Sequence, residues 1–219
     1  TMPLKQEAIA TVDELDPVGK LMGAVSCIVV RRDNSLLGVN NDWIGFRDNL
    51  NATFPGWKST TQSALVLGAG GGGLAIVYAL VQEGLKEIVI TNRSQERAEQ
   101  IADIFKHQNI IVRPWSDRHS FVAESDLIVN TTNQGMAGQT PLDLSLELAK
   151  LDAIVADIIY VPLETALIRD AKSRGLRTVG GLGMLLHQSR PAWQLWFGID
   201  PQITDHLRSA MEQDINLDV

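Results

Sequence analysis

Residues 65–73 read Leu-Val-Leu-Gly-Ala-Gly-Gly-Gly-Gly, an apolar run that ends in a cluster of glycines. The glycines follow the spacing G-x-G-x-x-G, and a helical pattern of apolar residues continues over 74–81. In this arrangement the first glycine permits a tight turn, the second admits a phosphate, and the third lets helix and strand pack closely. Free N–H groups at the helix start favour an anion. A plain glycine loop is the alternative, but the flanking strand and helix favour a dinucleotide site made by Gly68, Gly70, Gly71, Gly72 and Gly73.

The next strand indicates which dinucleotide binds. Residues 87–91 are largely apolar and β-branched, and Asn92, Arg93 and Ser94 follow them. An NAD site usually has an acid here for the ribose 2′-hydroxyl, whereas an arginine accommodates the 2′-phosphate of NADP. Arg93 can lie against that phosphate, Ser94 can also cap the following helix, and Arg97 lies one helical turn further on. Solvent-exposed helix charges are the alternative for the arginines. Together these residues favour NADP.

Short apolar strands alternate with helical patterns beyond residue 63. Strands are predicted at 64–67, 88–91, 110–113, 127–130, 154–158 and 177–179, with helices at 96–106 and 163–174. This βαβ rhythm is typical of a parallel sheet that is buried on both faces. We therefore predict an α/β fold with a Rossmann-type, doubly wound parallel sheet. Asn130, Thr131 and Thr132 end the fourth strand, at the edge where such sheets bind ligands.

The two ends of the chain do not fit this rhythm. We predict a helix at 12–22, a hairpin from 27–31 and 36–39, and helices at 184–197 and 201–213. These pieces suggest part of a second α/β domain that both chain ends build. We assign 1–42 and 181–219 to this substrate domain and 43–180 to the NADP-binding domain, with the active site in the cleft between them.

Composition narrows the functional classes. The 219 residues are 45% apolar and 21% charged, as in an ordinary globular protein. A net charge of −7 without a basic stripe argues against nucleic-acid binding. No apolar run reaches membrane-spanning length, and there is no signal-peptide pattern. The single cysteine, Cys27, lies in an apolar run and fits a cytoplasmic protein. The four histidines show no metal-ligand spacing, so we expect no metal.

Short motifs that run the length of the chain carry a family resemblance. They lie at 1–5, 15–17, 23–25, 40–42, 45–46, 92–94, 130–132, 135–136, 160–165, 181–185 and 187–188. Their content and order resemble the shikimate dehydrogenase family. The resemblance implies NADP-dependent hydride transfer that interconverts 3-dehydroshikimate and shikimate, or a closely related cyclic hydroxy acid. Family members also open with about sixty further residues, including a Ser-x-Ser element for the substrate carboxylate, so the resemblance leads us to expect further sequence before Thr1.

The resemblance also assigns roles. Oxidation of a secondary alcohol requires removal of the hydroxyl proton as the hydride leaves, and a lysine held by a carboxylate can take it. By the family pattern Lys5 and Asp42 form this pair, although spacing alone would make them a solvated lysine and a capping aspartate. Gln188 and Tyr160 match substrate contacts. Gly181 and Met184 match the nicotinamide side, with a core methionine as the alternative for Met184.

Two substrate-facing positions depart from the family. Ser26 stands where members usually have a substrate-binding asparagine, and Asn41 stands where they usually have threonine. These changes suggest the same reaction on an altered small-molecule substrate, so a relative that acts on quinate or aminoshikimate is one alternative. A non-catalytic NADP-binding regulatory protein is another, but such a protein would need neither Lys5 nor Asp42. A homodimer is also possible.

Overall fold

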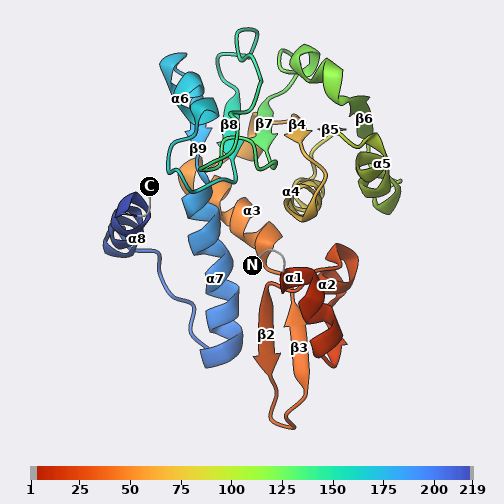
Figure 1. Cartoon of the computed structure of the whole chain (residues 1–219), viewed down its shortest axis with the longest axis vertical. Helices are drawn as coiled ribbons and strands as arrows, with labels where there is room; N and C mark the ends of the chain where they lie inside the picture. Colours follow the sequence, from red (N-terminus) through yellow and green to blue (C-terminus); the bar gives the residue numbers. More distant parts are fainter. Residues whose placement is uncertain (1–3, 218–219) are drawn as a thin grey trace.

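The computed structural model describes residues 4–217 and contains a large parallel sheet (Figure 1). Its strand order is β6-β5-β4-β7-β8-β9, and all neighbouring strands pair in parallel. The strands are β4 (Ser63–Leu67), β5 (Glu87–Asn92), β6 (Ile110–Pro114), β7 (Leu127–Asn130), β8 (Ile154–Asp157) and β9 (Arg177–Val179). The chain winds outward from β4 in both directions, which confirms the predicted doubly wound fold. The carboxyl ends of β4 and β7 form the switch point where such sheets bind ligands.

Alternate strand residues enter two separate cores, one on each face of this sheet. In β4, Val66 belongs to one core and Leu65 to the other, and both side chains are fully buried. The first face is covered by α3 (Asp42–Thr53), α4 (Gly71–Gln82) and α5 (Gln95–Ile104). The second is covered by the 3₁₀ helix η3 (Trp115–Phe121), the segment 142–149 and α6 (Ala166–Ser173). The continuous apolar strands therefore reflect burial on both sides.

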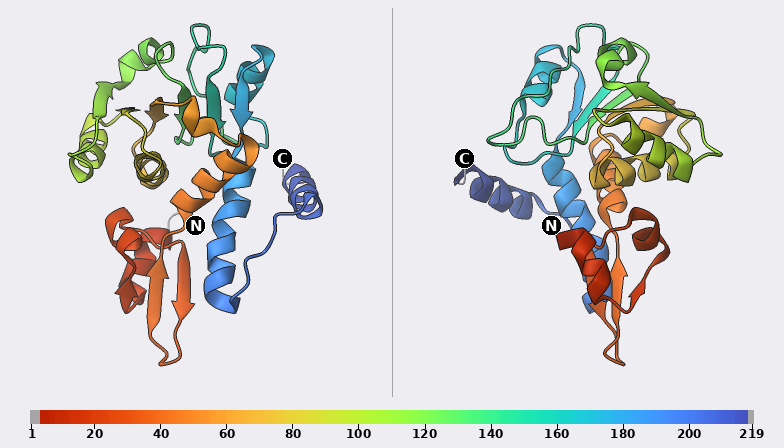
Figure 2. Two further views of the ribbon diagram at one scale, coloured as in Figure 1. Left: turned by 180° about the vertical axis from the view of Figure 1, so that it is seen from behind. Right: turned by 45° about the vertical axis from the view of Figure 1, so that its right-hand side comes forward.

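A smaller sheet lies near the start of the chain (Figure 2). It contains β1 (Glu14–Leu15), β2 (Cys27–Val30) and β3 (Leu36–Val39), in the order β1-β3-β2. The predicted hairpin is present, since β2 and β3 pair antiparallel. The predicted helix at 12–22 is wrong in its first half, because β1 pairs with β3.

The true helix, α2 (Pro17–Met22), begins where local chemistry dictates. Pro17 disfavours helical backbone at the residue before it, and a proline fits the first helical position. The Asp16 carboxylate caps the helix by accepting the Gly19 N–H at 2.7 Å. Gly23, with φ of 57°, ends it. The start signal therefore lay at residues 16–17 rather than at residue 12.

Three further short helices lie before the large sheet in sequence, and two longer helices complete the end of the chain. The former are α1 (Leu4–Glu7), η1 (Ala8–Thr11) and η2 (Trp57–Ser59); the latter are α7 (Gly181–Phe197) and α8 (Asp205–Leu217). Helix α7 lies along α3, as both views in Figure 2 show. Its Ala192 also packs against Cys27 and Val39 of the small sheet. Thus α7 connects the small sheet to the large one.

Candidate active site

Lys5 and Asp42 are 37 positions apart in sequence and form an ion pair. The Lys5 Nζ donates to both carboxylate oxygens of Asp42, at 2.8 and 2.6 Å. Helix α1 presents Lys5, whose carbonyl accepts the Val25 N–H at 2.8 Å. Asp42 is the first residue of α3 and is buried. A lysine fixed by a carboxylate in this way is placed to exchange a proton with a bound hydroxyl.

Asn40 holds Asp42 in position, a role that the sequence analysis missed. Its side-chain oxygen accepts the Asp42 N–H at 3.1 Å, and its Nδ2 donates to the carbonyl of Ala24 at 3.1 Å. Asparagine commonly bonds the backbone two residues ahead, so its place just before α3 was an available signal. Asn40 thereby ties the start of α3 to the segment before β2.

Ser26 and Asn41 are also in direct contact. The Ser26 hydroxyl accepts the Asn41 N–H at 2.7 Å and donates to the carbonyl of Val39 at 3.5 Å. The Ser26 hydroxyl therefore contacts the backbone on both sides. The Asn41 side chain is buried, and within residues 4–217 it forms no hydrogen bond. Asn41 thus has the freer polar group, although Ser26 and Lys5 both line a hollow of about 130 Å³.

The other predicted substrate and nicotinamide residues lie around α7 and the loop after β8. Gln188 is half-buried on the side of α7 that faces Gly45, one turn along α3 from Asp42. Met184 is buried and belongs to the core of the first sheet face, as its alternative reading expected. Tyr160 is exposed, and within the described residues no hydrogen bond joins it to Lys5 or Gln188.

The glycine turn after β4 has the geometry that its spacing predicts. Gly68 has a φ of 110°, which favours glycine. A Cβ on Gly73 would collide with the carbonyl oxygen of Gly68, so only glycine allows helix α4 this close to the strand. Around Gly70 and Gly71 the space is open. The turn therefore offers an uncovered helix start at the carboxyl edge of the sheet, as a pyrophosphate requires.

Neighbouring strands support this turn. The Thr131 hydroxyl, after β7, donates to the carbonyl of Leu67 at 2.8 Å. Asn92, at the end of β5, accepts the Ala69 N–H at 3.2 Å. Gly72 lies beside Ile158, and the Gly181 N–H donates to the carbonyl of Ile159 at 3.2 Å. The predicted cofactor residues of four separate segments thus gather at one edge.

Arg93, Ser94 and Arg97 are exposed at the end of β5 and the start of α5. The expected helix cap by Ser94 is wrong in detail, because the Ser94 side chain makes no capping bond. Its carbonyl instead accepts the Asn92 side-chain N–H at 2.8 Å. Within residues 4–217 neither arginine is in an ion pair, so both guanidinium groups are available to a phosphate.

Asn130 and Thr132 belong to a polar network at the ends of β7 and β8. The Asn130 side-chain oxygen accepts the N–H and the hydroxyl of Thr132, at 3.0 and 2.8 Å. Its Nδ2 donates to Asp157 at 3.1 Å. Burial raises the pKa of the Asp157 carboxyl to about 6. Sequence analysis missed Asp157, although an acid that ends an otherwise apolar strand was a visible signal.

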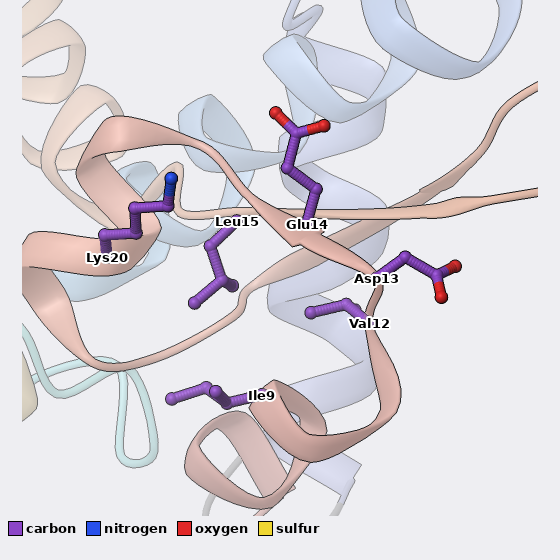
Figure 3. A pocket seen from close by; sticks show the side chains of 6 residues that line it. All are labelled: Ile9, Val12, Asp13, Glu14, Leu15 and Lys20. Atoms are coloured by element: carbon purple, nitrogen blue, oxygen red, sulfur yellow. The ribbon is translucent and has the colours of Figure 1, made fainter.

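A second hollow, of about 290 Å³, lies at the edge of the small sheet (Figure 3). Three apolar and three charged side chains line it: Ile9, Val12, Leu15, Asp13, Glu14 and Lys20. Both of its acids already have partners. Glu14 pairs with Arg31 at 2.8 Å, and Asp13 accepts the Leu36 N–H at 2.7 Å. None of the predicted catalytic or cofactor residues reaches this hollow. We therefore place the candidate site at Lys5 and Asp42.

Residues 4–217 contain no cluster of three or more potential metal ligands. Burial raises the pKa of the Cys27 thiol, which disfavours the reactive thiolate. No helix within the same range is long and apolar enough to cross a bilayer.

Comparisons with known proteins identify the family of this chain. Residues 51–144 match the family model of shikimate / quinate 5-dehydrogenase. Shikimate dehydrogenase (NADP(+)) of Azorhizobium caulinodans is 43% identical over 98% of this chain and 76% of its own length. The chain belongs to the shikimate dehydrogenase family. It spans about three quarters of that relative's length, and residues 1–3 of the first family motif lie outside the described residues.

Solved structures of the family share the fold. Shikimate 5-dehydrogenase from Thermus thermophilus, in complex with NADP(H) and shikimate, is 33% identical with a TM-score of 0.83. The match covers 100% of the present chain and 77% of the Thermus thermophilus chain. Quinate dehydrogenase from Corynebacterium glutamicum, in complex with NAD, is 27% identical with a TM-score of 0.86. That match covers 100% of the present chain and 76% of the quinate dehydrogenase chain. The same fold therefore serves related substrates and both dinucleotides.

Proposed function

We propose that this protein is an NADP-dependent dehydrogenase that interconverts 3-dehydroshikimate and shikimate. The observation that carries the proposal is the Lys5–Asp42 ion pair, with Nζ–O distances of 2.8 and 2.6 Å, in a chain that also has the dinucleotide turn. Family membership supports both the reaction and the cofactor. A protein that only binds NADP would need no such proton-transfer pair.

The residues present fit NADP. The open glycine turn and the start of α4 suit the pyrophosphate, and Arg93 suits the 2′-phosphate because no acid ends β5. Asn130, Thr131, Thr132, Gly181 and Met184 would surround the nicotinamide half. When bound, this cofactor accepts or supplies the hydride.

The chain's own residues handle the proton and the substrate. Lys5 takes the hydroxyl proton during oxidation and returns it during reduction, while Asp42 fixes the ammonium group and offsets its charge. Gln188 and the buried amide of Asn41 orient the ring hydroxyls, and Tyr160 lies at the mouth of the site. The Ser26 hydroxyl holds the backbone of Asn41.

The proposal is tested by NADPH formation from shikimate and NADP. Turnover with shikimate above that with quinate supports it, and NADP binding without turnover on either acid contradicts it. Turnover on quinate alone would favour the second candidate, a quinate dehydrogenase. That candidate is supported by Ser26 and Asn41, which depart from the usual family residues.

Two properties of the whole protein are separate proposals. A cytoplasmic location fits the single buried cysteine and is tested by cell fractionation. A homodimer would bury some of the exposed apolar side chains at the end of α7, such as Trp193 and Phe197. Light scattering at micromolar concentration measures this directly.

A further inference from the structure

A buried carboxylate that the proposed chemistry does not use joins two loops, one after β7 and one after β8. Both loops lie at the carboxyl edge of the large sheet, where ligands bind. Asp157, the last residue of β8, is 2% exposed. One of its oxygens accepts the Ile159 N–H at 3.0 Å and the Asn130 Nδ2 at 3.1 Å. The other accepts the Thr165 hydroxyl at 2.8 Å. Asp157 therefore contacts the ends of both loops at once.

The network extends through these partners. On the β7 side, Asn130 also donates to the carbonyl of Gln134 at 3.1 Å and accepts from Thr132. On the β8 side, Thr165 caps α6 by accepting the Ile168 N–H at 3.3 Å. The loop between β8 and α6 carries Tyr160. A single carboxylate thus connects the loop after β7, the loop after β8 and the start of α6.

The surroundings of Asp157 contain no compensating charge. Its partners from β7, the β8 loop and α6 are all neutral, and within residues 4–217 it forms no ion pair. A buried charge without a counter-ion is costly, so tight packing alone would favour a neutral side chain. What the charge provides here is an acceptor for three donors that come from three different segments.

The network is complete only when Asp157 is ionised. The Ile159 and Asn130 N–H groups can only donate, and each needs an acceptor. A proton on the remaining oxygen would point at the Thr165 hydroxyl and end its donation to Asp157. Since burial raises the pKa of Asp157 to about 6, this change falls within a pH range where enzyme assays are practical.

We propose that Asp157 is a positioning residue that holds the Thr132 and Tyr160 loops in the arrangement that binds the nicotinamide half of NADP and the substrate. The inference rests on the proposed function, because it takes both ligands from there. Asp157 acts through Asn130 and Thr165 rather than by touching the reacting atoms.

The test compares Asp157→Asn with Asp126→Asn, using NADP affinity and shikimate kinetics from pH 5.5 to 8.5. Asp126 is a matched control because it precedes β7 at the opposite edge, where it accepts the Gln62 and Ser63 N–H groups and pairs with Lys150 at 2.6 Å. For Asp157→Asn we expect kcat/KM to fall by about 10- to 100-fold, as misplacement of binding groups does. In wild type we expect kcat/KM to change in a step near pH 6. This step should disappear in Asp157→Asn, while Asp126→Asn keeps the step and near-normal activity.

Distinct outcomes contradict distinct statements. If wild type does not bind NADP, the proposed function fails. If wild type binds and turns over, but Asp157→Asn keeps its activity or its step near pH 6, only the positioning role is wrong. Should Asp157→Asn not fold, Thr165→Val and Thr165→Ser decide: the serine, which keeps the hydroxyl, must retain the activity and pH profile that the valine loses.

Discussion

Gly45 in α3 lies directly against Gln188 in α7, so closely that a Cβ on Gly45 would come within 2.6 Å of the Gln188 Cβ. It would come equally close to the carbonyl oxygen of Met184. Because Gly45 has no side chain, α3 and α7 can approach closely. This approach brings Asp42 of α3 and Gln188 of α7 to the same site. The packing of α3 on α7 sets the distance between the proton-transfer pair and the substrate-orienting amide.

Replacement of Gly45 by alanine should separate these helices. Overpacking of this kind costs about 1–3 kcal/mol of stability. We also expect kcat/KM for shikimate to fall more than NADP affinity, because Gln188 moves and the glycine turn does not. Ala52→Gly is a suitable control: Ala52 is exposed on α3, and the change costs about 1 kcal/mol of helix stability without touching α7. Equal kinetic losses in both variants would show that stability, not geometry, is responsible.

Lys5→Ala should abolish most turnover while leaving NADP affinity almost unchanged. Loss of general acid–base help costs about 10²–10⁴-fold in rate. Asp42→Asn should behave similarly, and the double variant should be little worse than either single one, since both residues serve one proton transfer. Stopped assays and cofactor titration measure the two effects separately. A kcat for Lys5→Ala within a few-fold of wild type would make Lys5 an ordinary surface lysine.

Arg93→Ala should weaken NADP more than NAD. A hydrogen bond to a charged group contributes about 1.5–3 kcal/mol, and only NADP has the 2′-phosphate. Arg97→Ala is the matched comparison, because Arg97 is also exposed but lies one turn into α5. We expect the smaller change there. Titration of both cofactors decides the assignment, and equal losses for NAD and NADP in Arg93→Ala would refute it.

The parallel sheet could be predicted because each strand is buried on both faces and so reads as a continuous apolar run. The glycine turn could be predicted because Gly68 and Gly73 are required by backbone geometry, which leaves a direct trace in sequence. The strand β1 could not: it has two residues, and its pairing with Leu37 and Gly38 is a tertiary contact without a local signal. The domain division at residues 42 and 180 stays a prediction.

Within the site, residue types were easier to predict than their partners. The family pattern placed Lys5 beside Asp42, and the structure brings them together. It also assigned Ser26 to the substrate, which stays a prediction; the structure adds that the Ser26 hydroxyl contacts the backbone of Asn41 and Val39. Asp157 was missed because its partners, Asn130 and Thr165, come from other segments. Such networks depend on topology, which pattern reading does not supply.

His187 should make the protein less stable in mild acid. It is buried on α7 with no hydrogen-bond partner for its Nδ1 within the described residues, and burial lowers its pKa below 6.5. The unfolded chain therefore binds a proton at His187 more readily than the folded chain does. The contribution of His187 to the free energy of unfolding is thus fully present above pH 6.5 and is lost as the pH falls. Asp48 opposes this shift, while Arg190 and Arg208 add to it. Urea unfolding of His187→Leu should lose less stability between pH 7 and pH 5 than wild type.

Asp157 provides a control of opposite sign for this measurement. Its raised pKa gives a stability contribution that is present below pH 3.8 and is lost as the pH rises to about 6. Relative to wild type, Asp157→Asn should therefore gain stability as the pH rises through that window. His187→Leu should gain stability relative to wild type as the pH falls. Parallel curves for His187→Leu and wild type would mean that His187 titrates normally in the folded protein.

Exchange at positions 26 and 41 should change substrate preference. The double variant Ser26→Asn, Asn41→Thr moves the amide from the start of α3 to the residue before β2, where family members usually have it. A site built to bond a hydroxyl rejects analogues that leave its polar groups unpaired, so the ratio of kcat/KM for shikimate to that for quinate should rise. Ser26→Ala is the control, because it removes only the hydroxyl that accepts the Asn41 N–H and should lower both activities alike. An unchanged ratio in the double variant would show that these two positions do not select the substrate.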